Sequence, residues 1–211
     1  ALGALGRSER SPIDPRSVAR ERARAVDIAL GLLTREAARA PFRVIEREWA
    51  VETLIAGVPV RLRIDRVDRF EDGRLAVLDY KTGTVPSAKQ VRLGLSPQLT
   101  LEAAMLRQGA FHGIDAGVSV GGFVYIKLSG ANPAGREFPI ELEDKDHPGL
   151  TPDVAADNAR EEFEKLVRKF DDEATGYTSL NLPMWKNRYG DYDDLARIKE
   201  WSIAGLGEEE W

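Results

Sequence analysis

The spacing of apolar residues divides the chain into helical and extended segments. Apolar residues recur every three or four positions over residues 18–39, which predicts an amphipathic helix that ends before Pro41. Residues 44–54 and 58–64 contain apolar residues in alternation with polar ones, the pattern of half-buried strands. Residues 75–80 are mostly apolar, so we expect a strand that is buried on both faces.

The second half of the chain predicts more helix than strand. Ser96 and Pro97 fit the N-cap and first position of a helix that runs to about Gln108. The other expected elements are a strand over 122–128 and helices over 152–172 and 191–201. This order of elements favours an α/β fold with a central mixed sheet.

Residues 1–17 show little periodicity, and we interpret them as a linker or a disordered N-terminal segment. Residues 18–211 are then expected to form one domain. Because the chain starts at Ala1 rather than Met, we expect it to be part of a longer protein.

Composition excludes several kinds of site. The 211 residues include no Cys, which excludes disulfides, thiolate zinc sites, iron–sulfur clusters and Cys nucleophiles. Two His make a His-rich metal cage or a Ser/His/Asp triad hard to assemble. The net charge of −5 argues against a passive polyanion-binding surface, but it is compatible with a nucleic-acid enzyme that binds metal ions.

The candidate chemistry lies at the end of the buried strand over 75–80. Asp79 and Lys81 are two positions apart, so their side chains project to the same face of that strand. A carboxylate at the end of a buried strand lies where ligands often bind in α/β sheets. The alternative interpretation is a simple ion pair at a strand end.

The register of the preceding hairpin decides whether Asp65 joins this pair. A two-residue turn at Asp72-Gly73 would send the Asp65 side chain to the wrong face. A three-residue loop over 71–73 would place Asp65 opposite Asp79, and Gly73 at its third position suits the left-handed conformation of such loops. We therefore predict the three-residue loop.

Two facing carboxylates repel each other unless a cation lies between them. Asp65 and Asp79 therefore predict a hard divalent ion, Mg²⁺ or Mn²⁺. Glu48 is a candidate third ligand, and Glu46 competes with it on the same face. With Lys81 orienting a water molecule or offsetting phosphate charge, the set describes metal-dependent hydrolysis of a phosphodiester.

The sequence around these residues resembles a known superfamily. Residues 64–68 (IDRVD), 79–83 (DYKTG) and Gln98 resemble the PD-(D/E)XK nucleases and, among them, the RecB-type exonucleases. Residues 96–104 and 189–201 resemble the C-terminal nuclease domain of the alphaproteobacterial AddB type. The resemblance implies a restriction-endonuclease-like core, in which a central mixed β-sheet is flanked by α-helices.

The resemblance also implies a role for each matching position. Asp65 and Asp79 would be metal ligands together with the backbone carbonyl of Tyr80, and Lys81 would be the catalytic lysine. Gln98 would lie near the metal and the DNA backbone. Glu48 would match an acidic position before the core. Glu102 stands where the family has a tyrosine, and we interpret it as solvated or structural rather than catalytic.

At the level of the whole protein, the resemblance implies a cytoplasmic bacterial DNA exonuclease that needs Mg²⁺ or Mn²⁺ and has no iron–sulfur cluster. Its partner would be the AddA helicase–nuclease subunit, in a complex that resects double-strand breaks for recombinational repair. Arg66 and Lys89 are candidate DNA contacts, although pairing of Arg66 with Asp68 or Glu71 is an equally good interpretation. The alternatives are a non-catalytic scaffold that guides DNA or docks AddA, and an endonuclease that acts on a different nucleic acid.

Overall fold

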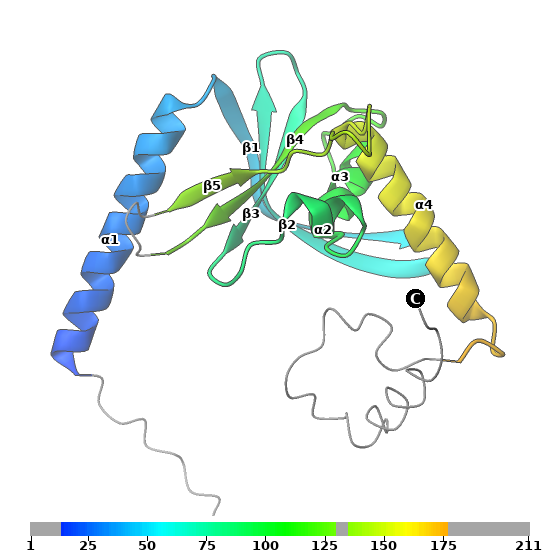
Figure 1. Cartoon of the computed structure of the whole chain (residues 1–211), viewed down its shortest axis with the longest axis horizontal. Coiled ribbons are helices and arrows are strands. Elements are labelled where there is room, and N and C mark those ends of the chain that lie inside the picture. The colour runs from blue at the N-terminus through cyan, green and yellow to red at the C-terminus, as the bar shows by residue number, and fades with distance from the viewer. Residues whose placement is uncertain (1–13, 130–134, 177–211) are drawn as a thin grey trace, which may run out of the picture. The chain divides into compact units, whose positions relative to one another are not determined.

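The computed structural model describes residues 14–129 and 135–176 (Figure 1). The chain divides into two compact units, residues 1–165 and 166–211. The first unit contains the sheet and most of the helical structure. Of the second unit, residues 166–176 are described. The predicted helix over 191–201 and the motif over 189–201 lie outside the described residues.

The first unit is built on a mixed sheet of five strands in sequence order (Figure 1). The strands are β1 (Phe42–Ile55), β2 (Val58–Phe70), β3 (Leu75–Lys81), β4 (Val120–Lys127) and β5 (Arg136–Pro139). Strands β3 and β4 run parallel, and the other neighbours are antiparallel. The central mixed sheet predicted from the sequence is confirmed; β5 was not predicted.

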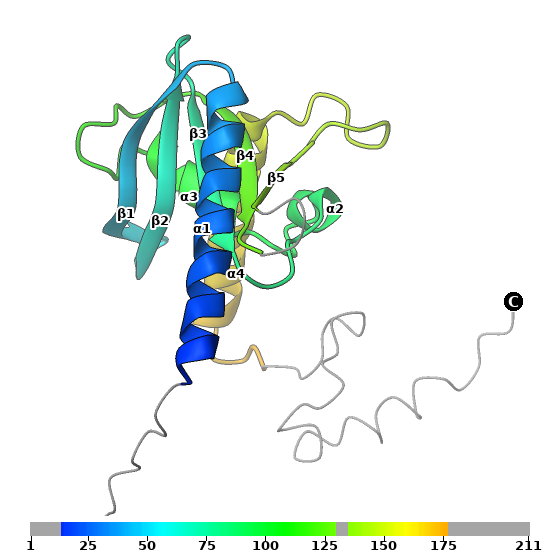
Figure 2. The ribbon, with the colours of Figure 1, turned by 90° about the vertical axis from the view of Figure 1, so that its left-hand side faces the viewer.

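Helices cover both faces of this sheet. They are α1 (Pro15–Ala38), α2 (Ala88–Arg92), α3 (Gln98–Arg107) and α4 (Pro152–Asp171). On one face, α3 packs its buried residues against Val67, Val77 and Tyr125. On the other face, Leu32 of α1 packs on Leu78 and its neighbours, and Figure 2 shows α1 in front of the sheet with α3 behind it. None of the described helices is long and apolar enough to cross a bilayer.

Two helices begin at residues other than those predicted, and local hydrogen bonds explain why. The Asp14 side chain accepts a hydrogen bond from the Arg16 N–H and Pro15 follows it, so α1 starts three residues before the predicted Val18. Helix α3 starts at Gln98 without a side-chain cap, because the Ser96 hydroxyl lies 3.5 Å from the Tyr125 hydroxyl instead.

The predicted hairpin register is confirmed. The Phe70 N–H donates to the Arg74 carbonyl at 2.9 Å, and Gly73 closes the loop with φ +86°. The ladder pairs Val67 with Val77 and ends at Arg66 with Leu78, so the next step places Asp65 opposite Asp79. Strand β3 is buried on both faces up to Leu78, as predicted, and its last residues carry the candidate chemistry.

Candidate active site

Asp79 and Lys81 project from the end of β3 toward the α3 side of the sheet. Asp79 is 3% exposed, and the Lys81 Nζ lies 2.9 Å from the Asp79 Oδ2. Strand β4 places Tyr125 directly beside Asp79, and the Lys81 Nζ is 5.7 Å from the centre of the Tyr125 ring. The two charged groups therefore form a pair that is closed on one side by an aromatic ring.

The sequence pattern indicated no role for Tyr125, because the residue lies in an apolar segment typical of a buried strand. Burial raises the pKa of its hydroxyl. Tyr125 lies beside Asp79 because β3 and β4 pair in parallel. A correct prediction of this strand pairing would therefore have found Tyr125.

Asp65 reaches the same strand end from β2. Its Oδ2 accepts a hydrogen bond from the backbone N–H of Tyr80 at 3.0 Å. The carboxylate thus bridges the two strands where their backbone ladder stops at Arg66 and Leu78. The structure therefore brings Asp65 to the end of the strand that carries Asp79 and Lys81.

Gln98, at the start of α3, connects the charged pair to the helix. Its Oε1 accepts a hydrogen bond from the Lys81 Nζ at 2.7 Å. Its Nε2 donates to the Asp79 Oδ1 at 2.6 Å and to the Glu102 Oε1 at 3.2 Å. The acceptor end faces the ammonium and the donor end faces two carboxyl groups, so the partners fix the orientation of the amide.

Glu102 is buried rather than solvated, which corrects one part of the sequence interpretation. It is 3% exposed, and its Oε2 has no hydrogen-bond partner. Burial raises the pKa of its carboxyl to about 8; nearby Asp79 and Asp65 add to the rise, while the Gln98 hydrogen bond and Lys81 oppose it. The apolar neighbours of Glu102 on α3 explain the burial, because one helix face enters the core.

This burial predicts that Glu102 lowers the stability of the metal-free protein as pH rises. The unfolded carboxyl ionises near pH 4.5, whereas the folded one stays protonated to about pH 8. Between these values the unfolded state binds fewer protons, so stability falls with rising pH, by a total on the order of 5 kcal/mol. In EDTA, Glu102→Gln should therefore stabilise the protein more at pH 8 than at pH 5, as measured by urea unfolding. An equal effect at both pH values would contradict the prediction.

Arg66 is buried on the opposite, α1 side of the sheet and is 5% exposed. Its guanidinium forms a two-pronged contact with Asp68, at 2.7 and 3.0 Å, and also contacts Glu36 and the Tyr80 hydroxyl. Burial alone would lower the pKa of Arg66, and these hydrogen bonds raise it above its usual value. Pairing with Asp68, the alternative interpretation, thus replaces the predicted DNA contact.

Glu48 and Lys89 lie outside the carboxylate cluster. The Glu48 side chain is 64% exposed and forms an ion pair with Arg63 at 3.2 Å. Its φ of +50° interrupts the regular alternation of β1 at this residue, and Glu46 is also exposed. Lys89 is exposed on the short helix α2. No contact of Glu48 in the described residues thus supports the prediction that it is a third metal ligand.

The donor set at the strand ends suits a hard cation. Within residues 14–129 and 135–176, no group of three or more Asp, Glu or His side chains could hold a metal ion. Mg²⁺ commonly binds one or two carboxylates and keeps several of its waters. The Asp79 Oδ2 is buried without a hydrogen bond, although Lys81 pairs with its charge. A pair of carboxylates therefore suits Mg²⁺, which keeps several waters, better than a metal that is ligated by protein side chains alone.

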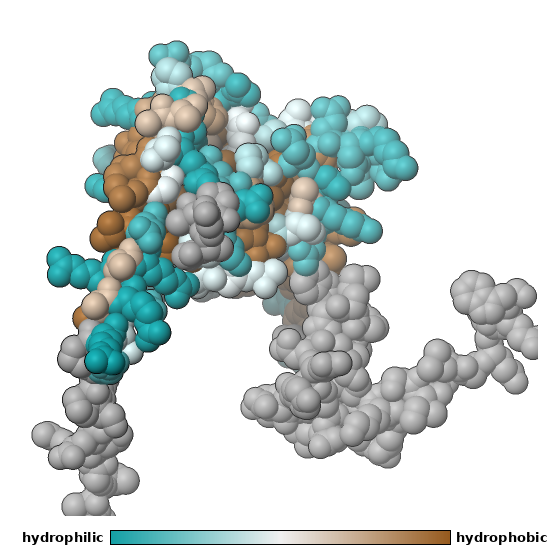
Figure 3. Space-filling view, turned by 60° about the vertical axis from the view of Figure 1, so that its left-hand side comes forward, coloured by the Kyte–Doolittle hydropathy of each residue, from teal (hydrophilic) through white to brown (hydrophobic). Residues whose placement is uncertain are grey.

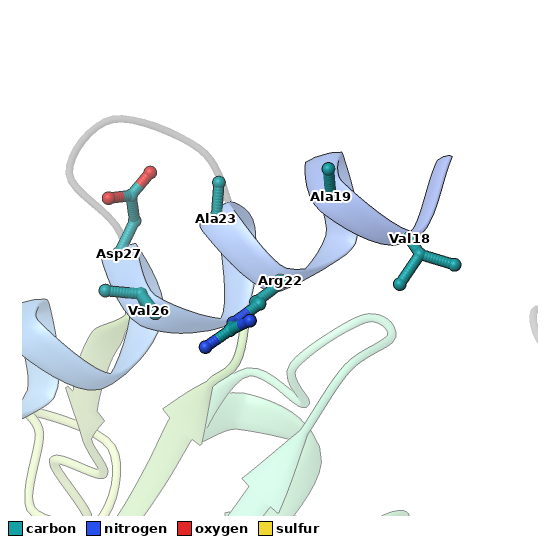
Figure 4. Close-up of a pocket in the computed structure, with 6 residues that line it drawn as sticks. All are labelled: Val18, Ala19, Arg22, Ala23, Val26 and Asp27. Carbon is teal, nitrogen blue, oxygen red and sulfur yellow. The ribbon is translucent and has the colours of Figure 1, made fainter. Parts of the chain in front are cut away.

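A hollow along α1 offers less chemistry than this cluster. It is lined by Val18, Ala19, Arg22, Ala23, Val26 and Asp27 (Figure 4). It therefore has one basic and one acidic side chain and none of the predicted catalytic residues. Apolar residues are also exposed on the molecular face that carries α1 (Figure 3), among them Leu30 and Leu33. The candidate active site is the cluster at the ends of β2 and β3.

Most of the chain matches a known protein family. The family model of the PD-(D/E)XK nuclease superfamily matches residues 4–192. The five-stranded mixed sheet with flanking helices is consistent with the predicted restriction-endonuclease-like fold of that superfamily. The match covers most of the chain and contains every residue of the cluster.

Similar curated proteins are uncharacterized proteins of Rickettsia. One, from Rickettsia felis, is 42% identical over 60 residues, which are 28% of this chain and 7% of the relative. Another, from Rickettsia bellii, is 32% identical over 90 residues, which are 37% of this chain and 11% of the relative. The matched part is thus a small share of each relative's length.

Proposed function

Because the chain belongs to the PD-(D/E)XK nuclease superfamily, we propose that it is a Mg²⁺-dependent DNA exonuclease domain. The observation that carries the proposal is the convergence of Asp79, Lys81 and Gln98, joined by contacts of 2.6 to 2.9 Å, with Asp65 at the same strand end. Acidic groups beside an ammonium at a strand end suit phosphodiester hydrolysis.

In the proposed reaction, Asp65, Asp79 and the Tyr80 carbonyl would hold Mg²⁺ or Mn²⁺. When bound, the ion supplies an acidified water and stabilises negative charge on the phosphate. Lys81 donates hydrogen bonds to the attacking water or to a phosphate oxygen, where its charge offsets the charge that develops. Gln98 holds Lys81 and Asp79 in place, and Lys89 is a proposed contact of the DNA backbone.

The test is a cleavage assay of the 211-residue chain with Mg²⁺ and with EDTA. Matched substrates are linear single-stranded DNA, the same DNA with both ends blocked, and its closed circle. We expect Mg²⁺-dependent release of nucleotides from the open linear form alone. Cleavage of the circle or of the blocked DNA would instead indicate the endonuclease. Failure to cleave any form, together with no binding of Mn²⁺ in calorimetry, would indicate a scaffold.

We also propose that the domain works within an AddAB-type complex in double-strand break resection, with AddA as its partner, in the bacterial cytoplasm. The support is the similarity of residues 96–104 to the AddB-type domain, together with that of residues 189–201, which lie outside the described residues. The small share of the Rickettsia relatives that the chain matches is compatible with a domain of a larger protein.

A further inference from the structure

Glu102 contacts the cluster, but the resemblance to known nucleases supplies no role for it. It lies one helical turn after Gln98, so both side chains share a face of α3. Its Oε1 accepts from the Gln98 Nε2 at 3.2 Å. The same nitrogen donates to Asp79, so Glu102 takes the second of the two N–H groups of the amide.

The position of this carboxyl is unfavourable for stability. Glu102 is almost fully buried, its Oε2 has no partner, and its helix neighbours Leu99, Ala103 and Leu106 belong to the hydrophobic core. An apolar side chain of similar length would avoid the cost of burying a polar group. A group that weakens the fold at a reactive cluster is more readily explained by function than by packing.

The contacts of Gln98 show what Glu102 can do there. The Gln98 amide holds Lys81 by its oxygen and Asp79 by its nitrogen. Without Glu102, one N–H of the amide would lose its acceptor, and the amide could rotate away from one of its two reactive partners. Direct metal ligation is a poorer explanation, because Glu102 is almost fully buried and its Oε1 already accepts from Gln98.

We propose that Glu102 is a positioning residue that holds the Gln98 amide, and through it the Lys81 ammonium and the Asp79 carboxylate, in the arrangement needed for cleavage. This inference rests on the proposed nuclease function. The Glu102 side chain must then supply a hydrogen-bond acceptor to Gln98, but it does not have to be charged.

Two variants separate the acceptor from the charge. Glu102→Met keeps the length but removes the strong acceptor, and misplaced reacting groups should then lower kcat about 10- to 100-fold with little change in KM for DNA. Glu102→Gln keeps an acceptor oxygen, so its kcat should remain within about fivefold of the parent value. The urea midpoint of Glu102→Met in EDTA should equal or exceed that of the parent, since a buried carboxyl is removed.

Thr100→Val is the matched control on the same helix. Thr100 is also buried, but its hydroxyl donates to the Pro97 carbonyl at 2.9 Å. This variant should lower the urea midpoint and leave kcat at the parent value. It shows whether a loss of stability in α3 by itself lowers the rate.

A second readout is independent of cleavage. In the metal-free parent, both side-chain N–H protons of Gln98 should be protected from solvent exchange in NMR spectra, because each has an acceptor. In Glu102→Met, one of them should lose protection, and in Glu102→Gln both should keep it.

Three results would overturn the inference. They are a parental kcat in Glu102→Met, an equal loss of kcat in Glu102→Gln, and a loss of kcat in Glu102→Met that is matched by a loss of stability. If the parent chain itself fails to cleave DNA with Mg²⁺, the proposed function fails, whereas the exchange of the Gln98 protons still tests the positioning contact.

Discussion

Asp79→Asn is expected to lower Mg²⁺-dependent DNA cleavage by at least about a thousandfold, because several kcal/mol of charge stabilisation depend on a bound ion. The asparagine keeps the size of the side chain and an oxygen for Gln98, which now bonds to the Asp79 Oδ1. It removes the charge that the proposed ion requires. Cleavage and Mn²⁺ binding in calorimetry should therefore be lost together.

Lys81→Met should abolish DNA cleavage without weakening Mn²⁺ binding. The Lys81 ammonium lies 2.9 Å from the Asp79 Oδ2, so it competes electrostatically with a cation at that carboxylate. Its removal should leave Mn²⁺ binding unchanged or tighter, although cleavage falls as far as in Asp79→Asn. A loss of binding in Lys81→Met would contradict the separate roles assigned to the two residues.

Lys165→Met is the control for Lys81→Met. Lys165 is an exposed lysine on α4 whose ammonium pairs with Glu162 at 2.7 Å. Its loss should change neither cleavage nor Mn²⁺ binding. Cleavage by Asp79→Asn at the parental rate would refute the proposed site, whatever the control shows.

The sequence predicted the Asp65, Asp79 and Lys81 arrangement because local rules determine it. A loop that ends in Gly73 sets the register of β2 and β3, and the alternation along β3 places Asp79 and Lys81 on one face. The contact of Gln98 with this cluster needs the helix α3 to pack over the sheet. The contact brings Gln98 to Lys81 and Asp79, and its implied position near a metal stays a prediction.

Glu102, Arg66 and Tyr125 could not be placed from the sequence because their surroundings come from distant segments. Charged residues alternate along β2 around Arg66, a pattern typical of an exposed strand face. In the structure, α1 covers this face, and its Glu36 pairs with Arg66. Arg39, directly after α1, pairs with Asp68. Likewise, Glu102 is buried because α3 lies against the sheet, which the local pattern around it does not reveal.

The largest expected effect on stability follows from this buried network. Asp68 is fully buried and accepts hydrogen bonds from Arg66 and from Arg39, the latter at 3.0 Å. Asp68→Ala leaves the buried guanidinium of Arg66 without its main counter-charge, which should cost about 3–5 kcal/mol in the free energy of unfolding. That is a large share of the stability of a typical domain. Urea unfolding followed by circular dichroism measures the loss.

The matched control is the exposed pair of Arg61 on β2 and Glu52 on β1. Its atoms are 2.8 Å apart, as close as those of the buried pair, but both side chains are in solvent. Arg61→Ala should therefore cost less than about 1 kcal/mol. Equal losses in the two variants would show that burial does not strengthen the Asp68 network. The expected difference matters for the active site too, because Arg66 also contacts the hydroxyl of Tyr80, whose backbone N–H holds Asp65.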